Sequence, residues 1–517
     1  MDSKLEALRQ HLKEQQLGIS LISPSDPNFE AVRACFVKRD ADVPLAIARP
    51  QTAEHVQALV KYCVAHRVDF VVRSGGHDCA GRSQVNGVLT IDMRDIAYVR
   101  VGANEKTAAV GGGVLIRDIT KELDSIGLIT PVGTVASVGY VGWATLGGYG
   151  PFATSHGLGV DQIVGAKIVN AKGELVDADE ELLRGIRGGG GIFGVIVELT
   201  IKVYRLKELF ASLIVFESSN LQSTWASFTD GYEKMMSDTT TPRALQLQTF
   251  GIELPDLGKV LAVSATWADD DKEEGEKWLN KVAGFGNCLI YDPEPISVSA
   301  FTAFNDSLLV YGSWGRGYTI NVKAYTPKTA EVLAKYTGLI PGGGIAISVH
   351  TLRAPASSEE SVFGSRFDHL MIELVAMTGV QDLEAKGAEW SQAFLKELKD
   401  SDPLNVLESA YVSLLGNDDS DYKAIYGEHY NKLLELKKTY DPGNVFKYAV
   451  PRLCIDQLGR GVVGCLTVTG ILAGFSPIFF FGAVGGNAAR LNGDGKNGEA
   501  VQAGCLRVAV RVGWLAC

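Results

Sequence analysis

Glycine is concentrated in a few short parts of this chain, and that distribution limits what it can fold into. The 58 glycines among 517 residues include one cluster within residues 131–166 and a second, RGGGGIFG, at 187–194. Neither cluster carries the GK[ST] end of a nucleotide-binding P-loop, and neither places GxGxxG between a strand and a helix. Glycine lets a ligand or another backbone segment approach the main chain closely. The clusters therefore favour a large anionic ligand bound by backbone N–H groups, with turns of a β-rich domain as the alternative.

A separate glycine pair lies earlier in the chain, in RSGGHDCAGRS at residues 73–83. The preceding run Phe70-Val71-Val72 is short and apolar, and a second such run, VLTI, follows at 88–91. Both runs are typical of buried strands. His77 is therefore predicted on a tight loop between two strands, and the alternative is a surface turn with an incidental histidine.

Composition excludes several classes of protein. A hydrophobic content of 46% and a charged content of 21% are those of a globular protein with room for two or more domains. The net charge of −11 argues against nucleic acid and anionic membranes as partners. No CxxC and no zinc-type Cys/His spacing occurs, so we expect no metal site and a reducing compartment. The charged N-terminus, with Leu5, Leu8 and Leu12 at helical spacing, lacks an apolar signal core, so we expect a cytoplasmic protein.

The pattern of elements predicts an α+β fold with five parts. A helical segment at 1–38 precedes a domain at 39–207 that has many strands, few helices and a two-stranded meander at 162–178. Residues 208–410 alternate strands with helices, which predicts an antiparallel sheet backed by helices. A segment at 411–453 contains a helix at 422–440, and residues 454–517 form an atypical apolar tail.

The tail includes an uncharged run at 461–486 that is long enough to span a bilayer. Pro477 and many glycines make this run a poor helix. We expect an extension that does not anchor the protein, and the alternative is a membrane anchor formed by residues 461–486.

Several of these segments together resemble the berberine-bridge-enzyme-like flavoprotein oxidases of the vanillyl-alcohol-oxidase superfamily, most closely the fungal members of secondary-metabolite pathways. The resemblance extends from about Asp40 to Phe446 and rests on RSGGHDCAGRS, the VGY-VGW-LGGYG run, GLGVDQIV, RGGGGIFGVI and YGEHYNKLLELKKTYDPGNVF, in the order and spacing of the family. It implies a PCMH-type two-part FAD-binding domain, a substrate domain and a C-terminal segment that returns to the FAD domain.

The resemblance also implies how FAD is held. The histidine after the glycine pair, here His77, would bond covalently to the 8α-methyl of FAD. Some members have a second anchor, a cysteine, but Val135 occupies that position and cannot form a thioether, so a single link is expected. The other cofactor contacts that the resemblance implies are Arg73, Ser74, Gly75, Gly76, Asp78, Thr134, Val138, Gly139, Gly142, Thr145, Gly148, Gly150, Asp161, Gly189, Val195, Asn444 and Phe446.

The catalytic group is less well determined by the sequence. Many members place an active tyrosine in a YxNY motif, and the matching stretch here is AYVSLLG, in which only Tyr411 fits. In the strand DHLMIELVA, His369 and Glu373 alternate and share a face, so either is a candidate base if that face meets the flavin. The alternative is an edge strand with its polar face in water. An aromatic substrate wall of Tyr311, Trp314 and Tyr318 is as well supported as ordinary core packing.

The family resemblance implies an oxidase that removes two electrons from a small organic substrate and passes them to O2 to form H2O2. Because the YxNY tyrosine is absent, a cyclase or isomerase with a flavin that undergoes no redox change is an alternative. A binding module without flavin is a third possibility.

Overall fold

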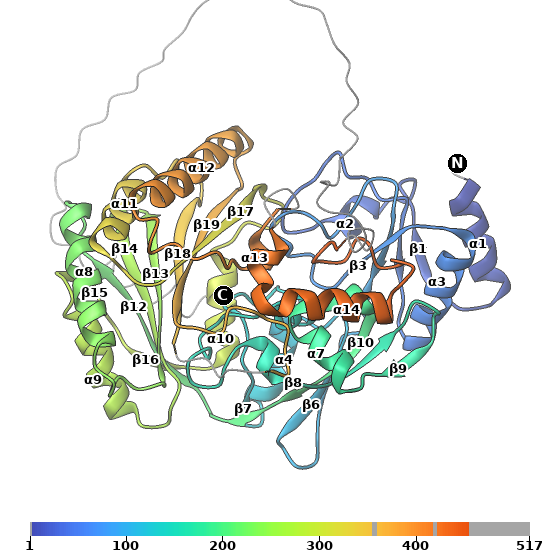
Figure 1. The fold of residues 1–517 in the computed structure, drawn as a ribbon, viewed down its shortest axis with the longest axis horizontal. Helices are drawn as coiled ribbons and strands as arrows, with labels where there is room; N and C mark the ends of the chain where they lie inside the picture. Colours follow the sequence, from blue (N-terminus) through green and yellow to red (C-terminus); the bar gives the residue numbers. More distant parts are fainter. Residues whose placement is uncertain (1–2, 354–358, 417–420, 454–517) are drawn as a thin grey trace, which may run out of the picture. The chain divides into compact units, whose positions relative to one another are not determined.

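The computed structural model describes residues 3–353, 359–416 and 421–453, which all fall within one compact unit, Met1–Ile455 (Figure 1). The predictions for the tail at 454–517, including the run at 461–486, lie outside these residues. Within the described part, no helix has both the length and the apolar character needed to cross a membrane. The boundaries predicted at residues 207 and 410 stay predictions.

The first sheet contains the strand that leads to His77. Its order is β1-β2-β4-β3, in which β2, β4 and β3 are parallel. The parallel pairing requires a crossover, and helix α3 (Ala53–His66) provides it between β2 and β3, with Val56, Leu59 and Val60 buried. The strands are β1 (Ser20–Ile22), β2 (Ala46–Arg49), β3 (Phe70–Arg73) and β4 (Leu89–Asp92).

The segment at 1–38 is more than helical. Helix α1 (Ser3–Glu14) buries the predicted leucines, and α2 (Phe29–Arg33) follows, but β1 lies between them and pairs with β2. The N-terminal segment therefore completes the first sheet. The sequence prediction missed this strand because it has only three residues.

The second sheet is antiparallel, with the order β5-β6-β10-β8-β9. Strands β8 and β9 form the predicted meander. The strands are β5 (Val99–Val101), β6 (Thr107–Gly111), β8 (Ile163–Val169), β9 (Leu175–Asp177) and β10 (Val195–Lys202), and a short pair joins β7 (Leu128–Ile129) to β11 (Tyr204–Arg205). Besides the expected α4 (Ile116–Asp124), the region contains three further helices, α5 (Tyr140–Thr145), α6 (Gly159–Gln162) and α7 (Glu180–Gly189).

The third sheet confirms the predicted antiparallel sheet backed by helices. Its order is β15-β12-β14-β13-β18-β19-β17, and β16 also pairs with β12. The strands are β12 (Leu209–Phe216), β13 (Leu245–Leu254), β14 (Gly258–Trp267), β15 (Cys288–Ile290), β16 (Glu294–Ile296), β17 (Trp314–Val322), β18 (Ala346–Leu352) and β19 (His369–Thr378). Apolar side chains on one face, such as Ile347 and Leu374, share a buried core with Trp225, Phe228 and Phe394 from the helices.

Four helices pack on this apolar face (Figure 1). They are α8 (Leu221–Met236), α9 (Lys272–Ala283), α11 (Pro327–Gly338) and α12 (Glu384–Ser401). A further helix, α10 (Val298–Ser307), lies elsewhere and packs against α4. The opposite, more polar face of the sheet is therefore the one left for a substrate site.

The C-terminal segment lies against the first sheet. The single helix predicted at 422–440 is broken into α13 (Tyr422–Tyr426) and α14 (Tyr430–Tyr440) by Gly427, whose φ of +51° is outside the right-handed helical region. Beyond α14, the ring of Phe446 packs edge-on against Phe70 of β3, with the centroids 5.9 Å apart. This contact ties the C-terminal segment to the strand that precedes the His77 loop.

A buried ion pair holds this return. Lys437 Nζ lies 2.6 Å from Asp441 Oδ2, both side chains are almost fully buried, and Asp441 also accepts hydrogen bonds from the backbone N–H groups of Val445 and Phe446. We expect Asp441→Asn to lower the free energy of unfolding by about 3–5 kcal/mol, because it leaves a buried ammonium without its carboxylate. Urea unfolding followed by fluorescence measures the change. The matched control is Asp400→Asn, which removes an exposed Lys–Asp pair of the same i,i+4 spacing, formed with Lys396, and should change little; equal effects would contradict the prediction.

Truncation after Leu453 tests the role of the tail. Leu453 is buried, and the neighbouring Arg452 N donates a hydrogen bond to Tyr422 Oη at 3.1 Å, so the described part ends in an anchored residue. We expect the truncated protein to remain folded, yellow and active, as measured by circular dichroism, flavin absorbance and turnover. An aggregated or colourless product would show that the tail belongs to the fold, and a full-length protein that pellets with membranes while the truncated form does not would identify an anchor.

Candidate active site

Along the chain, the His77 loop is the first glycine-rich segment, residues 131–166 are the second, and RGGGGIFG at 187–194 is the third. The His77 loop lies directly against the second segment. A Cβ atom built on Gly75 would be 2.3 Å from Gly139 N, a distance that no side chain tolerates. Gly76 has a φ of +75°, which favours glycine. Ser74 Oγ donates to the carbonyl of Gly112 at 3.1 Å. The predicted close approach is therefore present, and the partner in the described structure is another backbone loop.

His77 is half-buried between two aromatic rings. Its imidazole stacks on Phe36 with the centroids 4.4 Å apart, and Tyr311 meets it edge-on at 5.7 Å. Nε2 lies 2.7 Å from Ser137 Oγ, and Nδ1 has no hydrogen bond within the described residues. Burial lowers the pKa of His77 to about 4, with Asp306 acting in the opposite sense and Arg117 reinforcing the decrease. The imidazole is therefore neutral near pH 7 and has a nucleophilic nitrogen available.

Two predicted cofactor ligands on this loop have protein partners instead. The Arg73 guanidinium donates to Asp92 at 2.6 Å and to the carbonyls of Val32 and Arg33, entirely inside the protein. Asp78 accepts from the Arg82 guanidinium at 2.8–3.0 Å. These two side chains fix the loop, and any contact that they make with a cofactor stays a prediction.

The glycines of the second segment serve different purposes. A Cβ on Gly150 would lie 1.9 Å from the carbonyl oxygen of Val132, so packing within the protein requires glycine there. Gly148, with a φ of +85°, donates its N–H to Tyr411 Oη at 3.3 Å. By contrast, a Cβ on Gly142, or on Gly191 of the third segment, would meet no atom within 4 Å. These two positions leave open space beside the backbone.

The remaining predicted cofactor residues lie in the interior around these loops. Thr145 Oγ1 donates to the carbonyl of Val141, Asp161 forms an ion pair with Arg366 at 2.7 Å, and Val138 accepts a hydrogen bond from Ile116 N. Val195 begins β10 in the core, and Gly189 packs under Leu433 and Phe193.

Asn444 and Phe446 have different surroundings. The amide oxygen of Asn444 is buried without a hydrogen-bond partner among the described residues, while Phe446 is core. A buried polar atom without a partner is uncommon and indicates that a ligand or water satisfies it.

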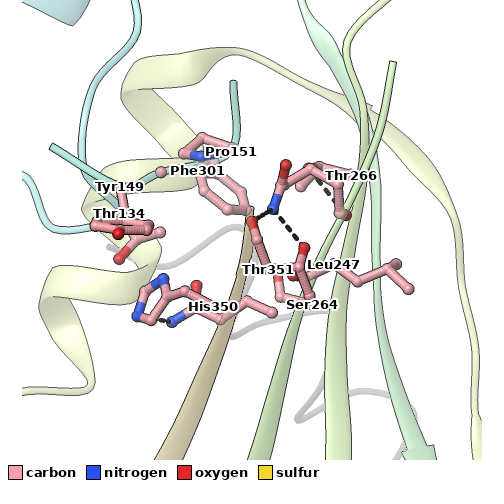
Figure 2. Close-up of a pocket in the computed structure, with 12 residues that line it drawn as sticks. Thr134, Tyr149, Pro151, Leu247, Ser264, Thr266, Phe301, His350 and Thr351 are labelled. Carbon is pink, nitrogen blue, oxygen red and sulfur yellow. Dashed lines mark hydrogen bonds between the residues drawn. The ribbon is translucent and has the colours of Figure 1, made fainter. Parts of the chain in front are cut away.

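The second segment faces the polar side of the third sheet across a narrow pocket (Figure 2). Thr134 and Tyr149 form one wall, and the ring of His350 is turned toward them from β18. Uncharged hydrogen-bonding groups dominate the sheet side of the pocket, which is lined by Gln246, Gln248, Ser264, Thr266 and Thr351. A neutral, hydroxylated ligand suits such a lining.

Glu373 lies behind His350. His350 Nε2 is 3.4 Å from Glu373 Oε2, 3.3 Å from Gln248 Nε2 and 3.2 Å from Ser348 Oγ. In the third sheet β19 lies between β18 and β17, so the alternative that it is an edge strand is wrong. His350 was not predicted from the sequence, although it alternates with Ser348 and Leu352 in GIAISVHTL, which places these three residues on one face of a strand.

His369 and Tyr411, the other two predicted catalytic residues, do not line this pocket. His369 Nδ1 donates to the carbonyl of Phe367 at 2.8 Å, and its Nε2 accepts from Tyr149 Oη at 2.9 Å. Burial lowers the pKa of His369 and raises that of Tyr411 to about 12. Both rings pack edge-on against Tyr149, with centroid distances of 5.9 Å for His369 and 4.9 Å for Tyr411. They therefore orient Tyr149, which, like His350, was not predicted from the sequence.

The prediction that Tyr311, Trp314 and Tyr318 of VYGSWGRGYTI form one aromatic wall is wrong. Tyr311 lies beside His77, Trp314 packs under Lys38 Nζ at 4.6 Å, and Tyr318 belongs to the core on the helix side of the third sheet. Only Tyr311 lies near the His77 loop.

Two family models match the chain. The FAD binding domain model matches residues 44–179, and the model for berberine and berberine-like proteins matches residues 410–450. The FAD-linked oxidoreductase aurO of Gibberella zeae is 32% identical over 447 residues, 84% of this chain and 86% of that protein. The (R)-6-hydroxynicotine oxidase of Paenarthrobacter nicotinovorans is 32% identical over 204 residues, which are 38% of this chain and 44% of that protein.

Solved structures share the fold. The 6-hydroxy-D-nicotine oxidase of Arthrobacter nicotinovorans superposes with a TM-score of 0.74 at 22% identity, covering 84% of this chain and 97% of that one. The glucooligosaccharide oxidase of Acremonium strictum, described as carrying 6-S-cysteinyl, 8α-N1-histidyl FAD, gives a TM-score of 0.74 at 19% identity, covering 87% and 100%. The PCMH-type α+β fold expected from the sequence is confirmed.

The described residues fit an FAD cofactor. Gly142 and Gly191 leave space beside backbone N–H groups, Asn444 supplies a buried acceptor without a partner, and His77 supplies a neutral imidazole nitrogen. Such groups match the pyrophosphate, the polar edges and the 8α carbon of a flavin nucleotide.

Proposed function

The chain belongs to the berberine-bridge-enzyme-like family of FAD-linked oxidoreductases, and from that premise we propose that it is an oxidase with FAD attached covalently through His77. It oxidises a small organic molecule by two electrons and passes the electrons to O2, forming H2O2. The proposal rests mainly on the place of His77, which is neutral and lies on a loop packed against the second glycine-rich segment. The second segment also lines the polar pocket, through Thr134 and Tyr149. Bound FAD would supply the acceptor for a hydride from the substrate carbon.

His350 is the proposed base. Its ring faces the pocket, and its Nε2 faces the Glu373 carboxylate, an arrangement that supports uptake of a proton by the other ring nitrogen. Glu373 acts as a positioning residue, because it holds the ring and stabilises the positive charge that protonation creates. Tyr149, held by His369, forms the opposite wall and orients the substrate.

The substrate class follows from the lining. Gln246, Gln248, Ser264, Thr266 and Thr351 offer amide and hydroxyl groups without a permanent charge. We therefore propose a neutral hydroxylated compound, an intermediate of a biosynthetic pathway, as the substrate. Oxidation begins with removal of its O–H or N–H proton by His350.

The oxidase assignment can be tested without knowing the substrate. The purified protein is reduced with dithionite under anaerobic conditions and mixed with air-saturated buffer in a stopped-flow instrument. An oxidase regains its yellow absorbance rapidly and forms one equivalent of H2O2. Flavin that stays reduced for minutes would contradict the use of O2. In a second experiment, the oxidised protein is mixed anaerobically with an extract of cells that lack the gene. Flavin that keeps its yellow absorbance in that mixture would favour non-redox chemistry.

The acidic limit of FAD attachment provides a further prediction. The neutral imidazole is the nucleophile, and burial lowers the pKa of His77 to about 4, so the neutral form persists in moderate acid. The rate at which protein produced without flavin attaches added FAD should therefore stay constant from about pH 8 to about pH 5 and fall only below that range. Acid-quenched samples scored by in-gel flavin fluorescence give the rate. A decline centred near pH 6.5, the usual histidine pKa, would contradict the burial effect.

A further inference from the structure

Ser137 connects His77 to a carboxylate from a distant part of the chain. Ser137 Oγ lies 2.7 Å from His77 Nε2 and is also hydrogen-bonded to Asp306 Oδ1, while Ser137 N donates to the same oxygen at 3.2 Å. Ser137 belongs to the second glycine-rich segment, and Asp306 lies near the end of α10. Both residues line a pocket beside Gly75 and Tyr311.

The hydrogen bonds determine which ring nitrogen of His77 carries the proton. A carboxylate only accepts, so the hydroxyl proton of Ser137 points to Asp306 and the oxygen lone pairs remain for His77. Nε2 must then be the N–H donor, and the lone pair is on Nδ1. This nitrogen has no hydrogen bond among the described residues and is free to form a bond to carbon.

We propose that Ser137 and Asp306 form a proton relay for the covalent attachment of FAD to His77. The inference rests on the proposed function, because it assumes that the attachment occurs. In the reaction, Nδ1 would bond to the 8α carbon as one methyl C–H bond breaks and its proton passes to water. The Nε2 proton passes to Ser137 as the Ser137 proton passes to Asp306. The two electrons of the broken C–H bond enter the flavin ring, and O2 removes them as H2O2.

Other charged and polar groups around His77 do not provide this path. Arg117 is a cation, which disfavours protonation of the imidazole, and Tyr311 Oη donates to the carbonyl of Ala34. Among the groups that hydrogen-bond to His77 directly or through one residue, Asp306 is therefore the acceptor that the structure supplies. Positioned bases of this kind accelerate proton transfer about 10²- to 10⁴-fold.

The test compares attachment rates in variants produced without flavin. Added FAD is allowed to react, samples are quenched in acid, and bound flavin is scored by in-gel fluorescence. Asp306→Asn and Ser137→Ala should each slow attachment about 100-fold, and Ser137→Thr, which keeps the hydroxyl, should restore it. Non-covalent FAD affinity, measured by flavin fluorescence, should stay within about threefold of wild type. In Asp306→Asn the remaining rate should rise with pH as hydroxide replaces the carboxylate, whereas the wild-type rate stays flat.

Asp124→Asn is the matched control. Asp124 Oδ2 accepts from Ser299 N at 2.8 Å and so fixes the first turn of α10 without touching His77. This variant should attach FAD at the wild-type rate, and a loss equal to that of Asp306→Asn would show that helix position is what matters and would overturn the relay. If the wild-type protein attaches FAD and Asp306→Asn attaches it at the same rate, the relay is wrong and the His77 anchor stands. A wild-type protein that never retains flavin after acid would overturn the His77 anchor together with the relay.

Discussion

The His77→Ala protein is expected to fold, to bind FAD and to release all of it on acid denaturation. Loop residues tolerate substitution, and the glycine-rich segments that would contact the cofactor do not depend on the imidazole. Val135 cannot supply a second link, so the covalently held fraction should fall from nearly complete in the wild type to zero. Flavin fluorescence of the protein band on a denaturing gel measures that fraction. Turnover should also slow, because an alkylated imidazole raises the flavin's potential.

His156→Ala is the matched control for this substitution. His156 lies in the second glycine-rich segment and bonds to Ser155 Oγ, but makes no contact with His77. It should keep its flavin after denaturation. Fluorescence retained in the His77→Ala band would contradict both the anchor and the single link.

Substituting the proposed base should give the largest loss of turnover. We expect His350→Ala to lower kcat/KM about 10²- to 10⁴-fold, because the substrate proton then has no acceptor in the pocket. The amount of attached flavin should be unchanged, since His350 is on β18 and His77 is on a separate loop. Steady-state H2O2 production, normalised to bound flavin, measures the effect.

Glu373→Gln separates positioning from proton transfer. The variant keeps a hydrogen-bonding group 3.4 Å from His350 Nε2 and removes the charge, so kcat should fall, but less than in His350→Ala. His429→Gln, a half-buried histidine outside the pocket, serves as the control and should retain full activity. Full activity of His350→Ala would show that another group is the base.

The strands of the third sheet and most of the helices packed on it could be predicted, because their apolar residues recur at the spacing of a strand or of a helix. Strand β13 covers the run LQLQTFGIEL within the region where strands alternating with helices were predicted, and α9, α11 and α12 lie in the same region. Helix α8 was missed because serine, threonine and glycine interrupt it. Its signal was nevertheless present, since Trp225, Phe228, Tyr232 and Met235 are buried at helical spacing and Asn220 caps the first turn.

The site was predictable only where its parts are local in sequence. The GGH loop and the glycine clusters were visible as motifs, and the alternation in β19 placed His369 and Glu373 on one face. The Ser137–Asp306 contact and the pairing of His350 with Glu373 join residues 169 and 23 positions apart, which only the folded chain brings together. For the same reason the sequence could not indicate that His369 supports Tyr149 rather than facing the pocket.

Peptide mapping of the wild-type protein is the most direct test of covalent FAD attachment to His77. Protein from a flavin-replete host is precipitated in acid, washed free of unbound flavin, digested and analysed by mass spectrometry. The peptide containing His77 should carry the added mass of FAD, and fragmentation should place that mass on the imidazole. An unmodified His77 peptide, with all of the flavin in the acid supernatant or on another residue, would contradict this attachment.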